Sequence, residues 1–142
     1  MKMLIPHLSF PGNAEEAFEF YGKSLGGEIK RLMRWAEMPG SEKLPESDRE
    51  KIMHICLELK NGILIMGADS IESTGPMLKN GNNITLVIET ETKDQADEYY
   101  HNLEDGGLSV MPMHYAFWGS YFGMLTDKYS IKWMIEHNVA EE

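Results

Sequence analysis

The sequence is poor in cysteine and contains no long apolar run. Cys56 is the only cysteine among 142 residues, so no internal disulfide can form. It lies inside a short apolar segment, which predicts a small buried residue in a reducing, cytoplasmic protein. No stretch approaches the roughly 18 apolar residues of a membrane-spanning helix. The N-terminal ten residues hold one lysine and are interrupted by Pro6, which does not fit a signal peptide.

Basic side chains are also scarce. Lysine and arginine total 13 against 23 aspartates and glutamates, which gives a net charge of −10. A nucleic-acid surface or an anionic membrane requires a basic patch. We therefore expect neither partner and predict a small-molecule ligand instead.

The first half of the chain contains signals for one helix and several strands. Residues 3–10 predict a strand, and the Asn-Ala-Glu-Glu sequence at 13–16 predicts a capping box at the start of a helix. Alternation predicts further strands at 28–37 and 52–60, separated by a polar, mobile loop. The Asn61-Gly62 pair predicts a two-residue hairpin into a strand at 63–68.

The second half repeats this pattern. A second capping box, Thr-Lys-Asp-Gln at 92–95, lies 79 residues after the first, and the turn residues Gly62 and Ser130 lie 68 apart. The difference of 11 is about the length of the polar loop 38–50, which we interpret as an insertion. The sequence thus predicts an α+β protein of two tandem βαβββ modules.

We place the first module at residues 1–70, a linker at 71–82 and the second module at 83–142. Each module alone would expose one face of its sheet, so we expect the two to pair. The expected result is an incomplete eight-stranded barrel with the helices outside.

This duplicated pattern resembles the vicinal oxygen chelate superfamily, which includes glyoxalase I, fosfomycin-resistance proteins and extradiol dioxygenases. Within it, the chain is similar to the PhnB-like branch. The matching segments cover nearly the whole chain: Pro-Gly-Asn at 11–13, Glu-Ala-Phe-Glu-Phe-Tyr at 16–21, Gly-Gly-Glu at 26–28, His54, Ile-Met-Gly-Ala-Asp at 65–69, Met-Pro-Met at 111–113, Phe-Trp-Gly at 117–119, Phe-Gly-Met-Leu-Thr-Asp at 122–127 and Trp-Met-Ile at 133–135.

The resemblance implies a homodimer and a divalent metal held by four residues, from the first and last strand of each module. The repeat places these positions at Pro6, Met66, Thr85 and Met134. Proline has no side-chain donor and a thioether is soft, so this set suits no oxygen-seeking metal. We predict that no metal or other cofactor is bound; a divalent metal is the alternative.

PhnB-like chains are sometimes named demethylubiquinone methyltransferases. A doubly wound methyltransferase would need a glycine-rich loop after its first strand. This chain has Phe-Pro-Gly-Asn at 10–13 there, so its sequence does not support that name.

An aromatic and methionine-rich segment near the C-terminus predicts either an apolar ligand pocket, a dimer interface or core. By alternation Lys132 shares the face of Met134, where it would attract an anion or stay solvated beside a surface acid. The predicted ligand-binding residues are Met66, Thr85, Phe117, Trp118, Tyr121, Phe122, Lys132 and Met134.

His54 is the main candidate for catalysis. A two-residue hairpin at 61–62 would place it opposite Asp69, and such a pair either orients a general base or pins the ends of the hairpin. The alternative function is therefore a lyase- or dioxygenase-type enzyme with a displaced site at His54 and His7. Alternation points His7 away from the face on which Pro6 lies.

Overall fold

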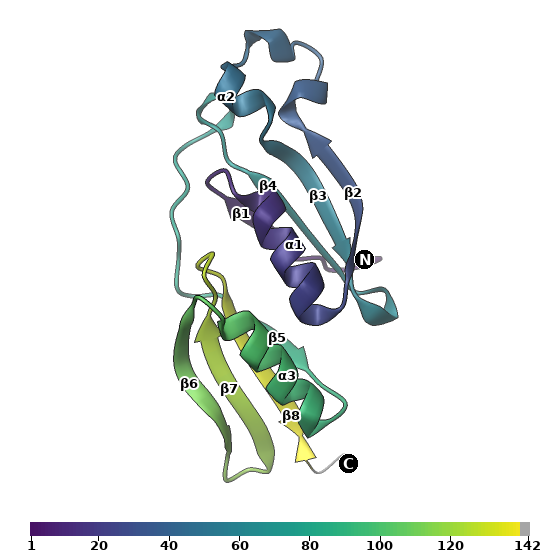
Figure 1. Cartoon of the computed structure of the whole chain (residues 1–142), viewed down its shortest axis with the longest axis vertical. Coiled ribbons are helices and arrows are strands. Elements are labelled where there is room, and N and C mark those ends of the chain that lie inside the picture. The colour runs from purple at the N-terminus through teal and green to yellow at the C-terminus, as the bar shows by residue number, and fades with distance from the viewer. Residues whose placement is uncertain (140–142) are drawn as a thin grey trace. The chain divides into compact units, whose positions relative to one another are not determined.

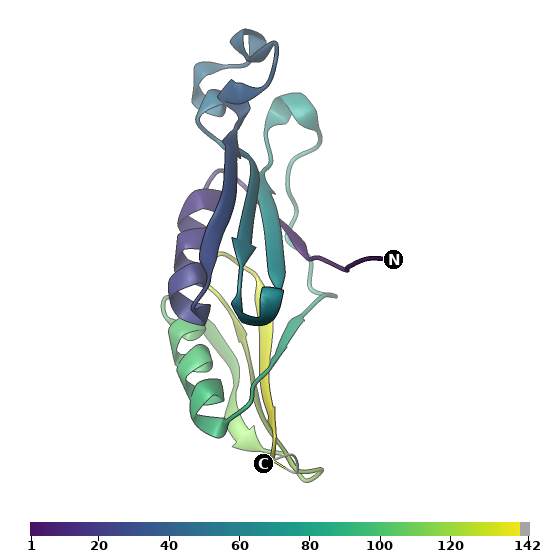
Figure 2. The same ribbon diagram turned by 90° about the vertical axis from the view of Figure 1, so that its right-hand side faces the viewer.

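The computed structural model describes residues 1–139, which fall into two compact units, the first Met1–Lys79 and the second beginning at Asn80. Each unit is a four-stranded sheet with one long helix across one of its faces (Figures 1 and 2). The predicted α+β class is confirmed, and the closing of eight strands into one barrel stays a prediction. No helix in the described part of the chain has the length and apolar character needed to cross a membrane.

The first unit has the strand order β1-β4-β3-β2. Strand β1 runs parallel to β4, and the other neighbours are antiparallel. Its elements are β1 (His7–Phe10), α1 (Ala14–Leu25), β2 (Glu28–Arg34), β3 (Ile52–Glu58) and β4 (Leu64–Asp69).

The second unit repeats this topology with the order β5-β8-β7-β6. Strand β5 is parallel to β8, and the remaining pairs are antiparallel. Its elements are β5 (Leu86–Glu89), α3 (Lys93–Glu104), β6 (Leu108–Tyr115), β7 (Ser120–Thr126) and β8 (Lys132–Asn138).

The predicted duplication is confirmed by the bounds of these elements. Both long helices have 12 residues, and α3 starts and ends 79 residues after α1. Strand β7 starts and ends 68 residues after β3. The offset changes between helix and third strand because the first unit has a longer connection there.

That longer connection is more ordered than its composition predicts. Strand β2 ends at Arg34, earlier than expected, because a short 3-10 helix, Trp35–Glu37, follows it. A second 3-10 turn, Ser41–Lys43, precedes the one-turn helix α2, Glu46–Arg49. The guanidinium of Arg49 donates to the carbonyls of Leu44 and Glu42. These side-chain bonds tie the loop to itself, which alternation and propensity alone do not reveal.

Of the two predicted capping boxes, only the second makes its N-cap side-chain bond, and its return bond reaches the residue before the cap. The hydroxyl of Thr92 accepts from the Gln95 amide at 3.1 Å, and the Gln95 side chain accepts from the amide of Glu91. The Asn13 side chain makes no capping bond. The Ala14 amide donates instead to the carboxylate of Asp69 at 2.9 Å.

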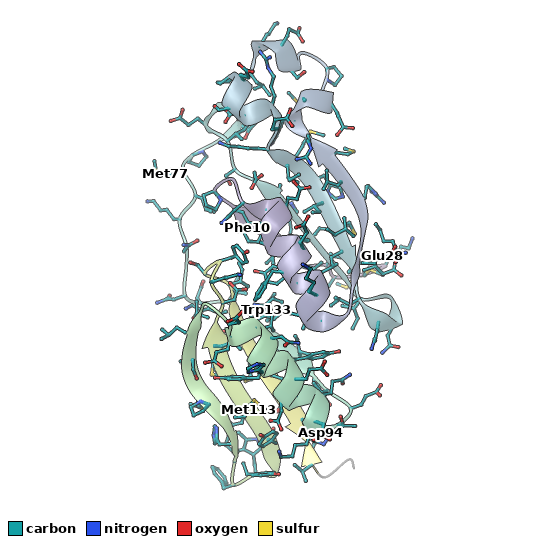
Figure 3. All side chains as sticks on the ribbon, in the orientation of Figure 1. Phe10, Glu28, Met77, Asp94, Met113 and Trp133 are labelled. Atoms are coloured by element: carbon teal, nitrogen blue, oxygen red, sulfur yellow. The ribbon has the colours of Figure 1, made fainter. Side chains whose placement is uncertain are left out.

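The cores lie between each helix and its own sheet. In the first unit Phe10 meets Phe18 edge to face at 5.9 Å, and Phe18 lies against Gly67, where an added Cβ would be 2.6 Å from its ring. Helix α1 therefore packs closely on β4 because residue 67 lacks a side chain. In the second unit Trp133 is 2% exposed, and its indole N–H donates to Asp127 at 2.8 Å. Phe10 and Trp133 are both labelled in Figure 3.

Ser130 occupies a left-handed backbone conformation, with φ +72°, in the turn before β8. Left-handed backbone costs an L side chain roughly 1–2 kcal/mol, and glycine is free of that cost but loses more entropy on folding. We expect Ser130→Gly to raise the free energy of unfolding by about 0.5–1 kcal/mol in urea titrations. Asn61, at φ +63°, is the matched control. Asparagine tolerates this region, so Asn61→Gly should gain less. An equal gain in both variants would contradict the explanation.

Candidate functional site

Each sheet has one face under its own helix and one face opposite it, which we call the far face. Paired residues on neighbouring strands point to the same face, and successive residues alternate. Core residues such as Trp133 and Ile135 mark the helix side of β8. The alternate residues, including Met134 and Glu136, therefore lie on the far face.

A row of apolar side chains crosses the far face of the second unit. The register pairs Met111 with Met124, Met124 with Met134, and Met134 with Val87. One residue from each of the four strands thus contributes to the row. We call these four residues, Met111, Met124, Met134 and Val87, the methionine row. Three flexible thioether side chains in one row suit a loosely specified apolar ligand.

A second row lies beside it and is partly aromatic. Here His114 pairs with Phe122, and Phe122 pairs with Glu136. The Ser120 hydroxyl donates to the Glu136 carboxylate at 2.9 Å. The far face therefore combines an apolar surface with one carboxylate whose position is fixed by a hydrogen bond.

Aromatic rings are stacked at the end of this row. The ring of Phe122 contacts the His114 ring, with centroids 4.5 Å apart. It also stacks on the Trp118 ring, with centroids 5.6 Å apart and 28° between the ring planes. Phe117 meets Trp118 edge to face at 5.0 Å. We call His114, Phe117, Trp118 and Phe122 the aromatic stack. Trp118 is 61% exposed and Phe117 is 98% exposed, so the outer rings of the stack are accessible.

The two remaining residues predicted for this unit's ligand site lie near the methionine row. Lys132 pairs with Thr126 on the far face, one row beyond Met134. Thr85 immediately precedes β5, and Val87 is the residue opposite Met134. The structure thus groups Phe117, Trp118, Phe122, Lys132 and Met134 on one unit, while Met66 belongs to the other.

Tyr121, which the sequence predicts in the ligand site, does not lie on the far face. It pairs with His137 on the helix side of the sheet and is 7% exposed. Its hydroxyl donates to the Asp97 carboxylate on α3 at 2.5 Å, and the Lys93 ammonium lies 3.0 Å from the other oxygen of that carboxylate. Tyr121 therefore fastens helix α3 to the sheet. Adjacent residues on a strand point to opposite faces, so Tyr121 and Phe122 cannot share a site.

The same cluster shifts several pKa values. Burial raises the pKa of Tyr121, and the neighbouring Asp97 carboxylate adds to the rise. Burial also pushes the pKa of Asp97 upward, but the hydrogen bond from Tyr121 and the ammonium of Lys93 outweigh it and leave that pKa low. Asp97 thus stays ionised as an acceptor for the phenol.

We expect Tyr121→Phe to lower the free energy of unfolding by about 1–2 kcal/mol, because the buried side of Asp97 loses a donor. Tyr115→Phe is the control: its ring lies 4.7 Å from that of Tyr121, but Tyr115 is exposed. This control should change stability by less than about 0.5 kcal/mol. Neither variant should alter ligand binding on the far face, and a binding loss in Tyr121→Phe alone would show that the assignment is wrong.

The predicted pairing of His54 with Asp69 is also wrong. Glu58 pairs with Leu64 and Ile55 with Gly67, so the connection closes at Leu59 and Ile63, whose amide and carbonyl are 2.7 Å apart. The loop therefore holds three residues, 60–62, rather than two. A register shift of one residue reverses the face of every partner. His54 consequently lies on the far face and Asp69 on the helix side.

Asp69 has a structural role in this position. Its side chain is buried, and its two oxygens accept from the amides of Ala14, at 2.9 Å, and Ile52, at 2.8 Å. One carboxylate thereby joins the start of α1, the start of β3 and the end of β4. It is not available to orient a catalytic histidine.

A more polar row crosses the far face of the first unit. The register pairs Arg31 with Cys56, Cys56 with Met66, and Met66 with His7. The expected alternation of β1 is therefore shifted by one residue, because His7, and not Pro6, is opposite Met66. The Met66 amide donates to the carbonyl of Pro6. We call Arg31, Cys56, Met66 and His7 the mixed row.

His54 lies next to the mixed row, opposite Met33. Its pKa is lowered, first by burial and then by the positive charges of Arg31 and His7. Its Nε2 atom is buried and makes no hydrogen bond to any described residue. His54 and His7 thus share a face, which the predicted orientation of His7 did not anticipate.

Within residues 1–139, no three histidine, cysteine, aspartate or glutamate side chains are close enough to hold a metal ion together. The mixed row offers one imidazole, one thiol and one thioether, and the methionine row offers only thioethers. Hard divalent ions favour oxygen donors, which neither row supplies.

The chain was compared with known families and proteins. A family model described as 3-demethylubiquinone-9 3-methyltransferase matches residues 2–136. Protein YjdN from Escherichia coli K12 is 31% identical over 147 residues, covering 98% of this chain and 96% of that protein.

Solved structures agree with this match. Protein PA1353 from Pseudomonas aeruginosa has a TM-score of 0.85 at 27% identity, covering 97% of this chain and 98% of that one. The PhnB protein from Bacillus cereus has a TM-score of 0.78 at 26% identity, covering 96% and 99%. A glyoxalase-related enzyme from Fulvimarina pelagi, at 17% identity and a TM-score of 0.63 over 97% and 89%, shares the fold.

The likeness to these glyoxalase-related structures shows that the chain has the glyoxalase/dioxygenase fold. The chain belongs to the PhnB-like family, whose model carries the demethylubiquinone methyltransferase name.

The metal site implied by the superfamily does not fit this chain. Of the positions in the first and last strand of each unit, Met66, Met134 and Val87 supply no donor for a hard cation. His7 supplies one imidazole. We therefore derive no step through a metal.

Proposed function

We propose that the second unit binds a small, partly apolar molecule on its far face, against the aromatic stack and the methionine row. The observation that carries the proposal is the alignment of Met111, Met124, Met134 and Val87 across four strands beside stacked rings. A ligand seated there gains dispersion contacts and removes exposed apolar surface from water. Trp118 would cover it from the loop.

The polar groups of the same face set the polarity of the ligand. Glu136 holds a fixed acceptor beside Phe122, and Lys132 offers an ammonium one row beyond Met134. A ligand with an apolar body and one polar end fits this distribution better than a hydrocarbon. Binding uses side-chain contacts and requires no divalent ion. In this unit the positions implied for metal-binding residues hold a thioether and an aliphatic side chain.

The alternative is an enzyme with a displaced site at His54 and His7. One observation favours it: the two imidazoles share the far face of the first unit. The loss of Asp69 as a partner removes the orienting carboxylate of the original hypothesis. Unchanged turnover in His54→Ala and His7→Ala variants of a folded protein would eliminate this alternative.

The methyltransferase name comes from the family and from one structural relative. Phe10-Pro11-Gly12-Asn13 follow β1, and no Gly-x-Gly-x-x-Gly motif opens α1. These residues offer no phosphate or dinucleotide cradle of the kind that a doubly wound methyltransferase uses.

The homodimer also stays a prediction.

The proposal is tested with N-phenyl-1-naphthylamine, a neutral apolar dye, added to protein labelled with ¹⁵N. We expect the indole N–H resonance of Trp118 to shift progressively during the titration, because its ring lies at the proposed site. The indole of Trp133 is buried and bonded to Asp127, so its resonance should stay in place.

Dye affinity in variants provides the second readout. Trp118→Ala should weaken binding about tenfold, since one stacked ring contributes roughly 1–1.5 kcal/mol. Met77→Ala removes an exposed apolar side chain from the other unit and should leave affinity unchanged. Equal losses in both variants, or a shift of all indole resonances together, would refute the site.

A further inference from the structure

The far face of the first unit carries positive charge that nothing nearby neutralises. Arg31 is exposed on β2, and no hydrogen bond or ion pair links its guanidinium to another residue in 1–139. Its neighbours in the sequence behave differently. The ammonium of Lys30 is 3.2 Å from Glu28, and the guanidinium of Arg34 bonds to Glu15 on α1. An unpaired arginine is notable in a chain whose net charge is −10.

Two imidazoles share this face with Arg31. His7 stands at the other end of the mixed row on β1 and is exposed. His54 lies between them on β3, close enough for the charges of both to depress its pKa. The buried Nε2 of His54 has no partner among the described residues.

The other groups on the face determine which ligand it can take. Along β3 and β4 the mixed row contributes Cys56 and Met66, whose sulfur atoms are at most weakly polar. The acids of the face, Glu28 and Glu58, pair with each other at the far end of β2 and β3. Two carboxylates side by side repel an anion, which directs it toward the Arg31 end of the row.

The equivalent row of the second unit provides the contrast. It contains Met111 where the first unit has Arg31, Met124 for Cys56, Met134 for Met66 and Val87 for His7. The duplicated scaffold thus presents a cationic and polar row in one unit and an apolar row in the other. A structural requirement common to both units does not explain the arginine and the histidine.

We propose that the far face of the first unit binds a compact oxyanion, a carboxylate or a phosphoryl group, with Arg31 as the anchor, while His7 at the other edge of the sheet adds to the positive charge of the face. The planar guanidinium matches either group with two parallel hydrogen bonds. The bound charge lies near His54 and offsets the repulsion that Arg31 and His7 exert on its protonated form. The site stands independently of the apolar site proposed for the second unit.

The test follows the pKa of His54 by ¹H–¹³C NMR, with inorganic phosphate and acetate as probes against a chloride reference. Bound phosphate should raise the pKa of His54 by about one unit, because a nearby anion stabilises the protonated ring. If acetate also raises it, a carboxylate suffices; if phosphate alone acts, the site selects phosphoryl groups. Neither anion raising the pKa of His54 would overturn the proposal.

Two variants that each remove one positive charge test whether phosphate binding depends on one particular side chain. Arg31→Gln should weaken phosphate binding about tenfold, because charge-assisted hydrogen bonds are lost. Lys30→Gln, whose ammonium is engaged with Glu28, should leave it unchanged. Without anion, Arg31→Gln should itself raise the pKa of His54, since a positive neighbour is removed. Because unfolding would also raise this pKa by removing the burial that lowers it, circular dichroism checks that both variants are folded. Equal weakening in both variants would show nonspecific screening and contradict the site.

Discussion

Replacing Asp69 with asparagine should lower the free energy of unfolding by about 3 kcal/mol, the largest stability change that we expect for a single side chain of the first unit. The carboxylate is 3% exposed and accepts two buried amides, from Ala14 and Ile52. Hydrogen bonds to a charged group contribute roughly 1.5–3 kcal/mol each. Asparagine keeps one acceptor and turns its amide nitrogen toward the other N–H, so one buried donor loses its partner.

The control for this prediction is Asp94→Asn. Asp94 lies in the first turn of α3 and is exposed, so its carboxylate interacts with the helix N-terminus through solvent. Its loss should cost less than about 1 kcal/mol in urea or thermal unfolding. If the two variants are equally stable, Asp69 does not hold the first unit together as described.

Replacing Phe122 with alanine should weaken dye binding about thirtyfold, the largest functional effect that we expect. Phe122 is the middle of the aromatic stack, in contact with both His114 and Trp118. Its removal deletes an aromatic surface and frees its two neighbours to move. Together, these losses amount to roughly 2 kcal/mol.

Phe122→Leu separates stacking from volume. Leucine fills most of the space but cannot stack, so affinity should fall between those of the wild type and Phe122→Ala. Phe20→Ala, which removes a half-buried ring from α1 of the other unit, should leave affinity unchanged. Circular dichroism checks the fold of all three variants. Wild-type affinity in a folded Phe122→Ala protein would contradict the proposed site.

The sequence predicts the elements of this fold because its signals are local and occur twice. The helical stripes and their glycine stops place α1 and α3 correctly, and the common offset of 79 supports both. The alternation of Trp133 and Met134 correctly divides β8 into a core side and a far face. Position within the repeat also predicts that Met134 stands where the superfamily that the sequence resembles has a metal ligand.

The pairing of residues across strands could not be predicted to the same precision. Asn61 and Gly62 both adopt left-handed conformations, as the hairpin signal implies, but Lys60 joins the loop as well. One extra loop residue moved His54 and Asp69 to opposite faces. Likewise, the repeat offset of the helices does not hold for the parallel strand, where His7 takes the position assigned to Pro6.

Alternation in the sequence does not place some of the far-face side chains, for a related reason. Arg31 and His114 follow bulges in β2 and β6, where the period of two is interrupted. Glu136, by contrast, is two residues from Met134 on a regular strand, so alternation places it on the far face. Tyr121 is close to Trp118 and Phe122 in sequence, but it alternates with Phe122 along β7 and so points to the opposite face.

The central claim is that a PhnB-like chain with thioethers at its metal positions binds an apolar molecule without a metal. Its most direct test is the affinity for N-phenyl-1-naphthylamine, measured by fluorescence after dialysis against EDTA and again with added Mn²⁺ or Ni²⁺. The account predicts dissociation constants equal within about twofold in all three conditions, with Phe122→Ala weakened equally in each. A loss of more than about tenfold after EDTA, restored by the metal, would contradict it.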